Sequence, residues 1–195
     1  FDGSSLYFRE AVKDYIDKNF TDVDLYSDGL KIYTTLDSRM QDCAEKAVRN
    51  QMKIIQRNFD AHWRGVGDPW RDEKGQIIPG FIEDKVKKTD TYKILAARFP
   101  NNPDSVDYYL NLPHDVELFS YDGPIHKTMS TVDSLKYMVK FMHAGLVAME
   151  PETGYVRAYV GDIDFKTWQY DKVRSMRQPG STFKLFVYAA AMKKG

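Results

Sequence analysis

The sequence predicts an α+β fold, in which a part built of helices and short strands is followed by a β-hairpin and a closing helix. Three observations lead to this prediction. Residues 38–59 repeat apolar side chains at the spacing of one long amphipathic helix. Residues 145–161 contain two β-rich runs around a turn signal. Pro179-Gly180 then precedes a mostly apolar stretch of helical composition.

The first part of the chain predicts two helices and one strand. Residues 6–20 have helical apolar spacing, and the polar residues 21–24 end this helix. Residues 30–35 are typical of a strand. Asp37 or Ser38 is expected to cap the long helix. Its predicted buried stripe consists of Met40, Ala44, Ala47, Val48, Met52 and Ile55. The single cysteine, Cys43, falls on the same side and is expected to be a small core residue.

The middle of the chain alternates irregular and regular stretches. Residues 62–71 are expected to be irregular because of their glycine and proline content. We expect helices over 82–99, 104–110 and 133–143, and a strand over 116–121.

The hairpin is predicted from its own local chemistry. Residues 146–149 are a short apolar run, residues 151–154 form a turn, and residues 155–160 are rich in β-branched and aromatic side chains. We expect this hairpin to pack against the closing helix, with one sheet edge left open.

The chemistry of the chain is concentrated in residues 177–184, Arg-Gln-Pro-Gly-Ser-Thr-Phe-Lys. Ser181 is a favoured helix N-cap, and Lys184 lies one turn further on the same face. A neighbouring base activates a serine nucleophile, and a partly buried lysine near a helix N-terminus is suited to that role. Backbone N–H groups at the same end can stabilise an oxyanion.

The Ser-x-x-Lys spacing alone is weak evidence, because a chain of this length contains roughly one by chance. Its simplest interpretation is a serine-capped core helix whose lysine faces solvent. Lys172 and Arg177, just upstream, are suited either to steering a carboxylate-ended peptide or to anchoring the loop.

The flanking residues make the match specific. Residues 177–192 resemble the nucleophile motif of the class A penicillin-binding proteins. The hairpin 145–161 is similar to the one that opens their transpeptidase domain, and residues 28–48 resemble the linker that follows their glycosyltransferase domain. By this resemblance, residues 1–59 are the interdomain linker region and residues 60–143 are an inserted accessory module. Residues 144–195 are then the N-terminal part of the transpeptidase domain, carrying the hairpin and nucleophile helix of an incomplete penicillin-binding transpeptidase fold.

The resemblance implies a function for the parent protein. Ser181 would be the nucleophile of D,D-transpeptidation between peptidoglycan stem peptides, Lys184 its base, and the backbone N–H of Ser181 an oxyanion donor. β-Lactam antibiotics would acylate the same serine. The superfamily motifs S-x-N and K-T-G do not follow in residues 185–195, so we expect an excised fragment that is inactive by itself.

The resemblance also implies a location. The parent would act in the cell envelope, on the extracytoplasmic side of the cytoplasmic membrane, which is the periplasm in a Gram-negative organism. Its membrane anchor and its glycosyltransferase domain would lie outside this chain.

Composition excludes several other classes. Lysine plus arginine equals aspartate plus glutamate, 28 each, so no net charge attracts nucleic acid. No apolar run is long enough to span a membrane. The histidines are not spaced as metal ligands, so we expect neither a metal nor another cofactor.

Two other interpretations remain open. The chain could serve as an interaction module that docks an envelope regulatory protein or a glycan through residues 60–143. Trp63 and Trp70, each followed by arginine, would then form a platform, although packing of an irregular loop explains them more simply. A β-lactamase or β-lactam sensor also uses Ser-x-x-Lys, but the long segment before the hairpin argues against it.

Overall fold

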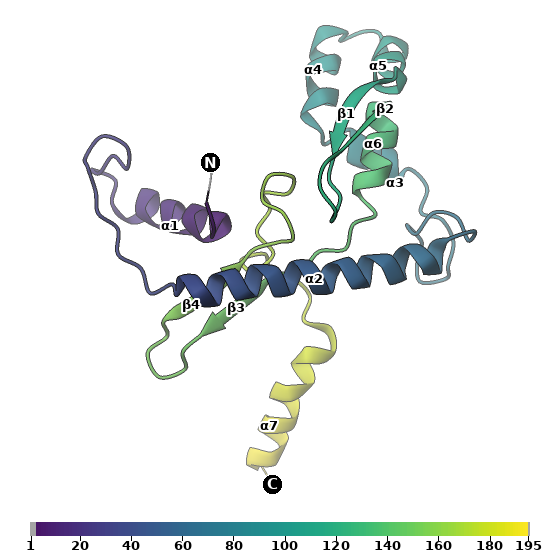
Figure 1. Cartoon of the computed structure of the whole chain (residues 1–195). Helices are drawn as coiled ribbons and strands as arrows, with labels where there is room; N and C mark the ends of the chain where they lie inside the picture. Colours follow the sequence, from purple (N-terminus) through teal and green to yellow (C-terminus); the bar gives the residue numbers. More distant parts are fainter. Residues whose placement is uncertain (1–2, 195) are drawn as a thin grey trace.

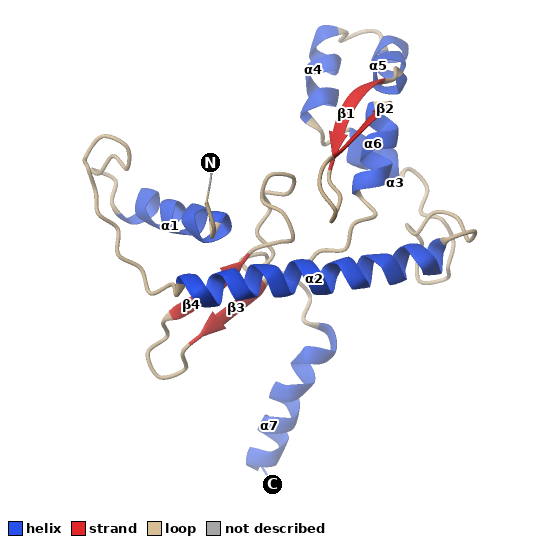
Figure 2. Ribbon diagram, in the orientation of Figure 1, coloured by secondary structure: helices blue, strands red, loops and turns tan. Residues whose placement is uncertain are grey.

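The structure is a computed structural model that describes residues 3–194. The long helix α2 lies at its centre (Figures 1 and 2). α1 and the β3–β4 hairpin lie along its N-terminal half, a body of helices with the β1–β2 hairpin lies toward its C-terminal half, and α7 projects away. The helices are α1 (Leu6–Asn19), α2 (Ser38–Trp63), α3 (Phe81–Val86), α4 (Asp90–Arg98), α5 (Pro103–Asn111), α6 (Thr131–Met138), the 3₁₀ turn η1 (Gly180–Phe183) and α7 (Lys184–Lys194). The strands are β1 (His114–Leu118), β2 (Ile125–Met129), β3 (Leu146–Met149) and β4 (Val156–Val160).

Helix α2 begins where its cap predicts. The carboxylate of Asp37 accepts hydrogen bonds from the N–H groups of Arg39 (2.9 Å) and Met40 (3.1 Å), which satisfies two donors of the first turn. Its buried stripe consists of Gln41, Ala44, Val48, Met52 and Gln56. The predicted stripe was therefore partly wrong, because it missed both glutamines.

The burial of Cys43 was also predicted wrongly, since Cys43 is exposed. Met40 and Ala47, from the predicted stripe, are exposed as well. Successive helix residues are about 100° apart. The helix turns Ala44 and Val48 toward the hairpin, and Cys43 therefore points to the side.

The predicted strand 30–35 does not form. This segment is extended but pairs with no other strand among the described residues. Only its end reaches β4. Thr35 Oγ1 donates to the carbonyl of Val156 (3.0 Å), and the N–H of Asp37 donates to the carbonyl of Arg157 (3.0 Å). Strand propensity without a backbone partner leaves an extended, exposed segment.

The middle segment follows the predicted order with different boundaries. The helix expected over 82–99 is divided into α3 and α4, because the Thr89 side chain accepts a hydrogen bond from the N–H of Tyr92 and so starts a new helix. The helix expected over 133–143 ends at Met138, and the strand expected over 116–121 lies over 114–118. Strand β2, the antiparallel partner of β1, was not predicted.

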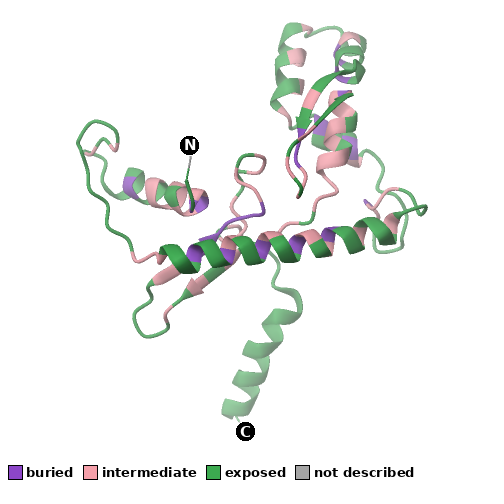
Figure 3. Ribbon diagram, viewed as in Figure 1, coloured by how far each residue is buried: buried purple, intermediate pink, exposed green. Residues whose placement is uncertain are grey.

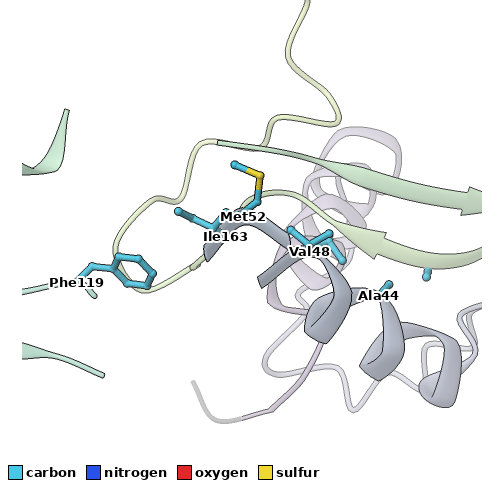
Figure 4. Packing of buried hydrophobic residues seen from close by; sticks show 7 residues of the cluster. Ala44, Val48, Met52, Phe119 and Ile163 are labelled. Atoms are coloured by element: carbon cyan, nitrogen blue, oxygen red, sulfur yellow. The ribbon is translucent and has the colours of Figure 1, made fainter. Parts of the chain in front are cut away.

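The β3–β4 hairpin is confirmed. Its strands are antiparallel, with Leu146 opposite Val160 and Ala148 opposite Ala158. It was expected to pack against the closing helix, and this is wrong, because its buried side lies against α2. One hydrophobic cluster joins the two elements (Figure 4) and consists of Ala44, Val48, Met52, Phe119, Ala158, Val160 and Ile163.

A second cluster lies in the body formed by α3–α6. It consists of Trp70, Ile82, Val86, Val106 and Leu110. α7, in contrast, has no buried residue and is exposed along its whole length (Figure 3). Within residues 3–194, no helix combines the length and apolarity needed to cross a membrane.

Candidate active site

Ser181 lies in the first turn before α7, but it is not the N-cap. The 3₁₀ turn η1 begins at Gly180, after Pro179, and no side chain caps it. The N–H of Lys184 donates to the carbonyl of Ser181, so Ser181 is already inside the helical turn. Gly180 has a φ of 55°, a conformation that favours glycine and permits the sharp entry. The predicted helix start is therefore correct to within a turn, and the predicted capping role is wrong.

The proposed base, Lys184, is exposed rather than partly buried. Ser181 is exposed too, and among the described residues the two side chains share no hydrogen bond. Their i, i+3 spacing places them one turn apart along η1 and α7. The arrangement presents a hydroxyl and an amine to solvent, without a wall that excludes water.

The segment leading to Ser181, residues 161–175, is here called the approach loop. Its anchor is Asp162, whose side chain is fully buried. Lys172 Nζ lies 3.5 Å and His143 Nδ1 2.9 Å from Asp162 Oδ2, and the N–H of Ile163 donates to Asp162 Oδ1 at 2.8 Å. His143 Nδ1 also lies 3.1 Å from Oδ1, whereas Oδ2 has no hydrogen bond among the described residues and faces the Lys172 ammonium. A buried carboxylate needs such a charged partner.

The contacts around Asp162 indicate which of its two possible roles Lys172 has. They also involve two residues, Asp162 and His143, for which the sequence indicated no role. Lys172 anchors the loop, since its ammonium pairs with Asp162 and its N–H donates to the carbonyl of Gly161 (2.8 Å). Asp162 and His143 were not identified from the sequence. The only signal for Asp162 is an acidic residue shortly after a predicted strand, which is too common to be informative.

The two tryptophans of the middle segment do not form a platform together. Trp70 is buried and stacks on Phe81, with ring centroids 5.6 Å apart and an interplanar angle of 10°. Trp63 is half-buried, and the Arg71 guanidinium lies 5.6 Å from its ring centroid. Packing of the irregular loop accounts for both rings, and the platform interpretation is wrong for Trp70.

Two cavities beside α1 lie away from Ser181. One of about 450 Å³ is bounded by α1 and residues 25–36, and one of about 360 Å³ lies between α1, α2 and residues 160–165. Among residues 3–194, no three His, Cys, Asp or Glu side chains come together as metal ligands.

Comparison with known proteins connects this geometry to a family. The family model of the penicillin-binding protein middle domain matches residues 66–142, and that of the penicillin-binding protein transpeptidase domain matches residues 144–195. Ser181 and Lys184 both fall inside the second match. The chain belongs to the penicillin-binding proteins. Most of the expected insertion, residues 60–143, is therefore covered by the middle-domain model of this family. The exact domain boundaries stay a prediction.

Similar proteins bear the name penicillin-binding protein 1A. The relative from Neisseria lactamica is 28% identical over 226 residues, an alignment that covers 100% of this chain and 27% of the relative. The relative from Rickettsia felis is 29% identical over 206 residues, covering 88% of this chain and 24% of the relative. This penicillin-binding protein chain therefore spans about a quarter of the length of the curated relatives it matches. No solved structure matches it significantly.

Proposed function

We propose that this chain is a segment of a peptidoglycan synthase in which Ser181 carries out D,D-transpeptidation. Ser181 Oγ bonds to the carbonyl carbon of the penultimate D-alanine of a stem peptide. The bond to the terminal D-alanine nitrogen breaks, and that amine leaves with a proton. An amine of a second strand then attacks the ester, forms the cross-link and restores the serine hydroxyl.

The observation that carries the proposal is the position of Ser181 in the transpeptidase match, exposed in the first turn of a helix with Lys184 one turn away. A serine needs a nearby base, and Lys184 is the basic side chain on that turn. The first N–H groups of a helix have no partner inside the helix. The N–H of Ser181 is therefore the proposed oxyanion donor.

The substrate class and location follow from the same proposal. Peptidoglycan stem peptides are the substrates, and β-lactams acylate Ser181 because they present a strained acyl group to the same nucleophile. The protein then works in the cell envelope, on the extracytoplasmic side of the cytoplasmic membrane, with glycosyltransferase activity elsewhere in the parent. An envelope regulatory protein or a glycan at residues 60–143 stays a prediction.

The 195-residue chain alone is expected to be inactive. A lysine acts as a base at neutral pH when burial disfavours its charged form, and Lys184 is exposed in this chain. Acylation also requires the substrate carboxylate to be held and the carbonyl to lie within ~3 Å of the serine oxygen. The S-x-N and K-T-G motifs that supply these contacts do not follow Ser181 in this chain.

Labelling with a fluorescent penicillin tests the proposal. The 195-residue chain and the same protein extended to the length of its relatives are incubated with the probe and separated on a denaturing gel. The extended protein should be labelled, and Ser181→Ala should abolish its label. Lys184→Met should slow labelling by roughly 10²-fold or more.

The controls are the neighbouring hydroxyl and another lysine of the same helix. Thr182→Val and Lys193→Met should retain most of the labelling rate. Equal labelling of wild type and Ser181→Ala would show that another residue is the nucleophile. Labelling of the short chain at the rate of the extended protein would contradict the expected inactivity.

A further inference from the structure

Helix α1 packs on the approach loop. It lies outside both family matches, the first of which begins at residue 66, so neither match assigns it a role. In Figure 1 the approach loop rises beside the end of α1 and above α2. The contacts between α1 and this loop involve its first half and its last residues.

Tyr7 contacts the first half of the loop, from Gly161 to Trp168. Its side chain is buried, and its hydroxyl donates a hydrogen bond to the carbonyl of Trp168. Its ring meets the Phe165 ring edge-on, with centroids 4.9 Å apart. A Cβ atom on Gly161 would lie 2.4 Å from Tyr7 Cδ1, so only glycine fits beneath this ring. The loop backbone is therefore seated directly against Tyr7.

The Tyr7 hydroxyl is a permanent donor in this setting. Burial, followed by the negative charge of Asp162, raises the pKa of Tyr7 far above its ordinary value. The phenol is therefore protonated at neutral pH and can donate there. Its bond to the Trp168 carbonyl does not depend on pH near neutrality.

Asp14 makes the contact at the far end of the loop. Its Oδ2 lies 2.7 Å from Arg174 Nη1, shortly before the Pro179-Gly180 turn that leads into Ser181. A single surface ion pair contributes little stability. Here it acts on the same loop as Tyr7, so the two contacts together restrict the path of the chain toward Ser181.

The loop is also fixed on its buried side by the contacts of Asp162 with Lys172 and His143. It therefore lies between an internal anchor and α1. Catalytic rates depend steeply on such restriction, because a misplacement of about 1 Å can cost roughly 10²-fold in rate.

We propose that α1 is a clamp on the approach loop and that Tyr7 is a positioning residue for the reaction of Ser181. The proposal rests on the proposed function for its catalytic part. The clamp itself is a property of the 195-residue chain, and it can be tested without any activity.

Hydrogen exchange of the 195-residue chain tests the clamp. Tyr7→Phe removes the hydroxyl and keeps the ring, and Asp14→Asn removes the ion pair. Both should accelerate exchange of the approach-loop amides by roughly tenfold while the amides of β3 and β4 keep their protection. Tyr15→Phe and Asp17→Asn, at exposed positions of the same helix, are the matched controls and should change nothing. Unchanged exchange in both Tyr7→Phe and Asp14→Asn overturns the clamp.

Acylation kinetics of the extended protein test the positioning role. The acylation rate constant of Ser181 is separated from the affinity of the non-covalent penicillin complex by varying the probe concentration. Tyr7→Phe should lower the rate constant by roughly threefold to tenfold and Tyr7→Ala by roughly tenfold to a hundredfold, a graded loss with the control variants unaffected.

Hydrogen exchange and acylation kinetics together distinguish failure of the proposed function from failure of the clamp or of the positioning role. If the wild-type extended protein is not acylated, the proposed function fails and the positioning role fails with it, while hydrogen exchange still decides whether α1 clamps the loop. If exchange accelerates but acylation stays at the wild-type rate, the clamp exists and the positioning role is overturned. If Tyr7→Ala does not fold, Tyr7→Phe and Asp14→Asn still decide whether α1 clamps the loop, and Tyr7→Phe decides the positioning role.

Discussion

Gln41 shows how one side chain can complete a sheet edge. It is fully buried on α2, its Oε1 accepts from the N–H of Tyr159 (2.7 Å), and its Nε2 donates to the carbonyl of Tyr159 (2.8 Å). A neighbouring strand would make the same pair of bonds. The edge of β4 at this point is therefore closed by a side chain, and open pairing there is prevented.

Replacing Gln41 should destabilise the protein, because its side chain forms the hydrogen bonds of the Tyr159 backbone. Gln41→Leu has a similar volume but leaves the buried N–H and carbonyl of Tyr159 without partners, which should cost about 1–3 kcal/mol. Urea denaturation measures this loss. Gln51→Leu, at an exposed position of the same helix, is the control. Equal unfolding midpoints for the two variants would show that Tyr159 finds other partners.

A second buried glutamine on the same stripe serves a different element. Gln56 Oε1 accepts from the N–H of Met142 (2.8 Å), and its Nε2 contacts the carbonyl of Lys140 (3.2 Å). α2 thus binds the hairpin through Gln41 and the connection from the middle segment through Gln56. One long helix sets the spacing between the two parts.

At the scale of elements, α7 is exposed along its whole length, so all of its apolar side chains lie in water. Leu185 is 71% exposed and Phe186 65% exposed. Most helical stability in proteins comes from packing of an apolar face, and isolated helices shorter than roughly 12–15 residues are marginal. α7 has eleven residues and therefore lacks both sources of stability.

We expect the amides of α7 to exchange quickly in the 195-residue chain. Their hydrogen-exchange rates should lie within about tenfold of those of an unstructured peptide, whereas the buried stripe of α2 should be strongly protected. The measurement is made over a concentration series. Protection of α7 equal to that of α2 at every concentration would contradict the expectation, and protection that rises with concentration would indicate association through this helix.

At the scale of the whole molecule, buried tyrosines link stability to alkaline pH. Burial raises the pKa of Tyr121 to about 12, and burial also raises the pKa values of Tyr7 and Tyr159. A free tyrosine has a pKa of about 10. Below that value the folded and unfolded chains are both protonated, so stability is unaffected. Above it the unfolded chain loses its protons first, so stability falls as pH rises toward the folded-state pKa values.

Tyr121→Phe should reduce the loss of stability that occurs as the pH rises above about 10. Its hydroxyl is buried with no hydrogen-bond partner among the described residues, so removal should change stability at pH 7 by less than about 1 kcal/mol. Urea denaturation between about pH 8 and pH 11 should show a smaller loss than in the wild type. Tyr33→Phe, at a position that is 89% exposed, should behave as the wild type does. Equal slopes for both variants would mean that Tyr121 ionises in the folded state as easily as in the unfolded chain.

Local chemistry was enough to predict several features of this protein. The Asp37 cap, the long helix after it and the β3–β4 hairpin depend on residues a few positions apart, and all are present. The motif around Ser181 likewise placed the chain among the penicillin-binding proteins, because the motif lies within one helical turn and its flanks. The roles of Ser181 and Lys184 stay predictions.

Only the tertiary structure decided which surfaces are buried. The tertiary structure turned Gln41 inward and Cys43 outward on α2 and exposed the apolar side chains of α7. It also left residues 30–35 without a strand partner among residues 3–194. The reason is that burial and strand pairing depend on partners far along the chain, as with Gln41 and Tyr159, which are 118 positions apart. Periodicity indicates that a helix has an apolar side, but the partner that packs against the helix determines which residues lie at the centre of the contact.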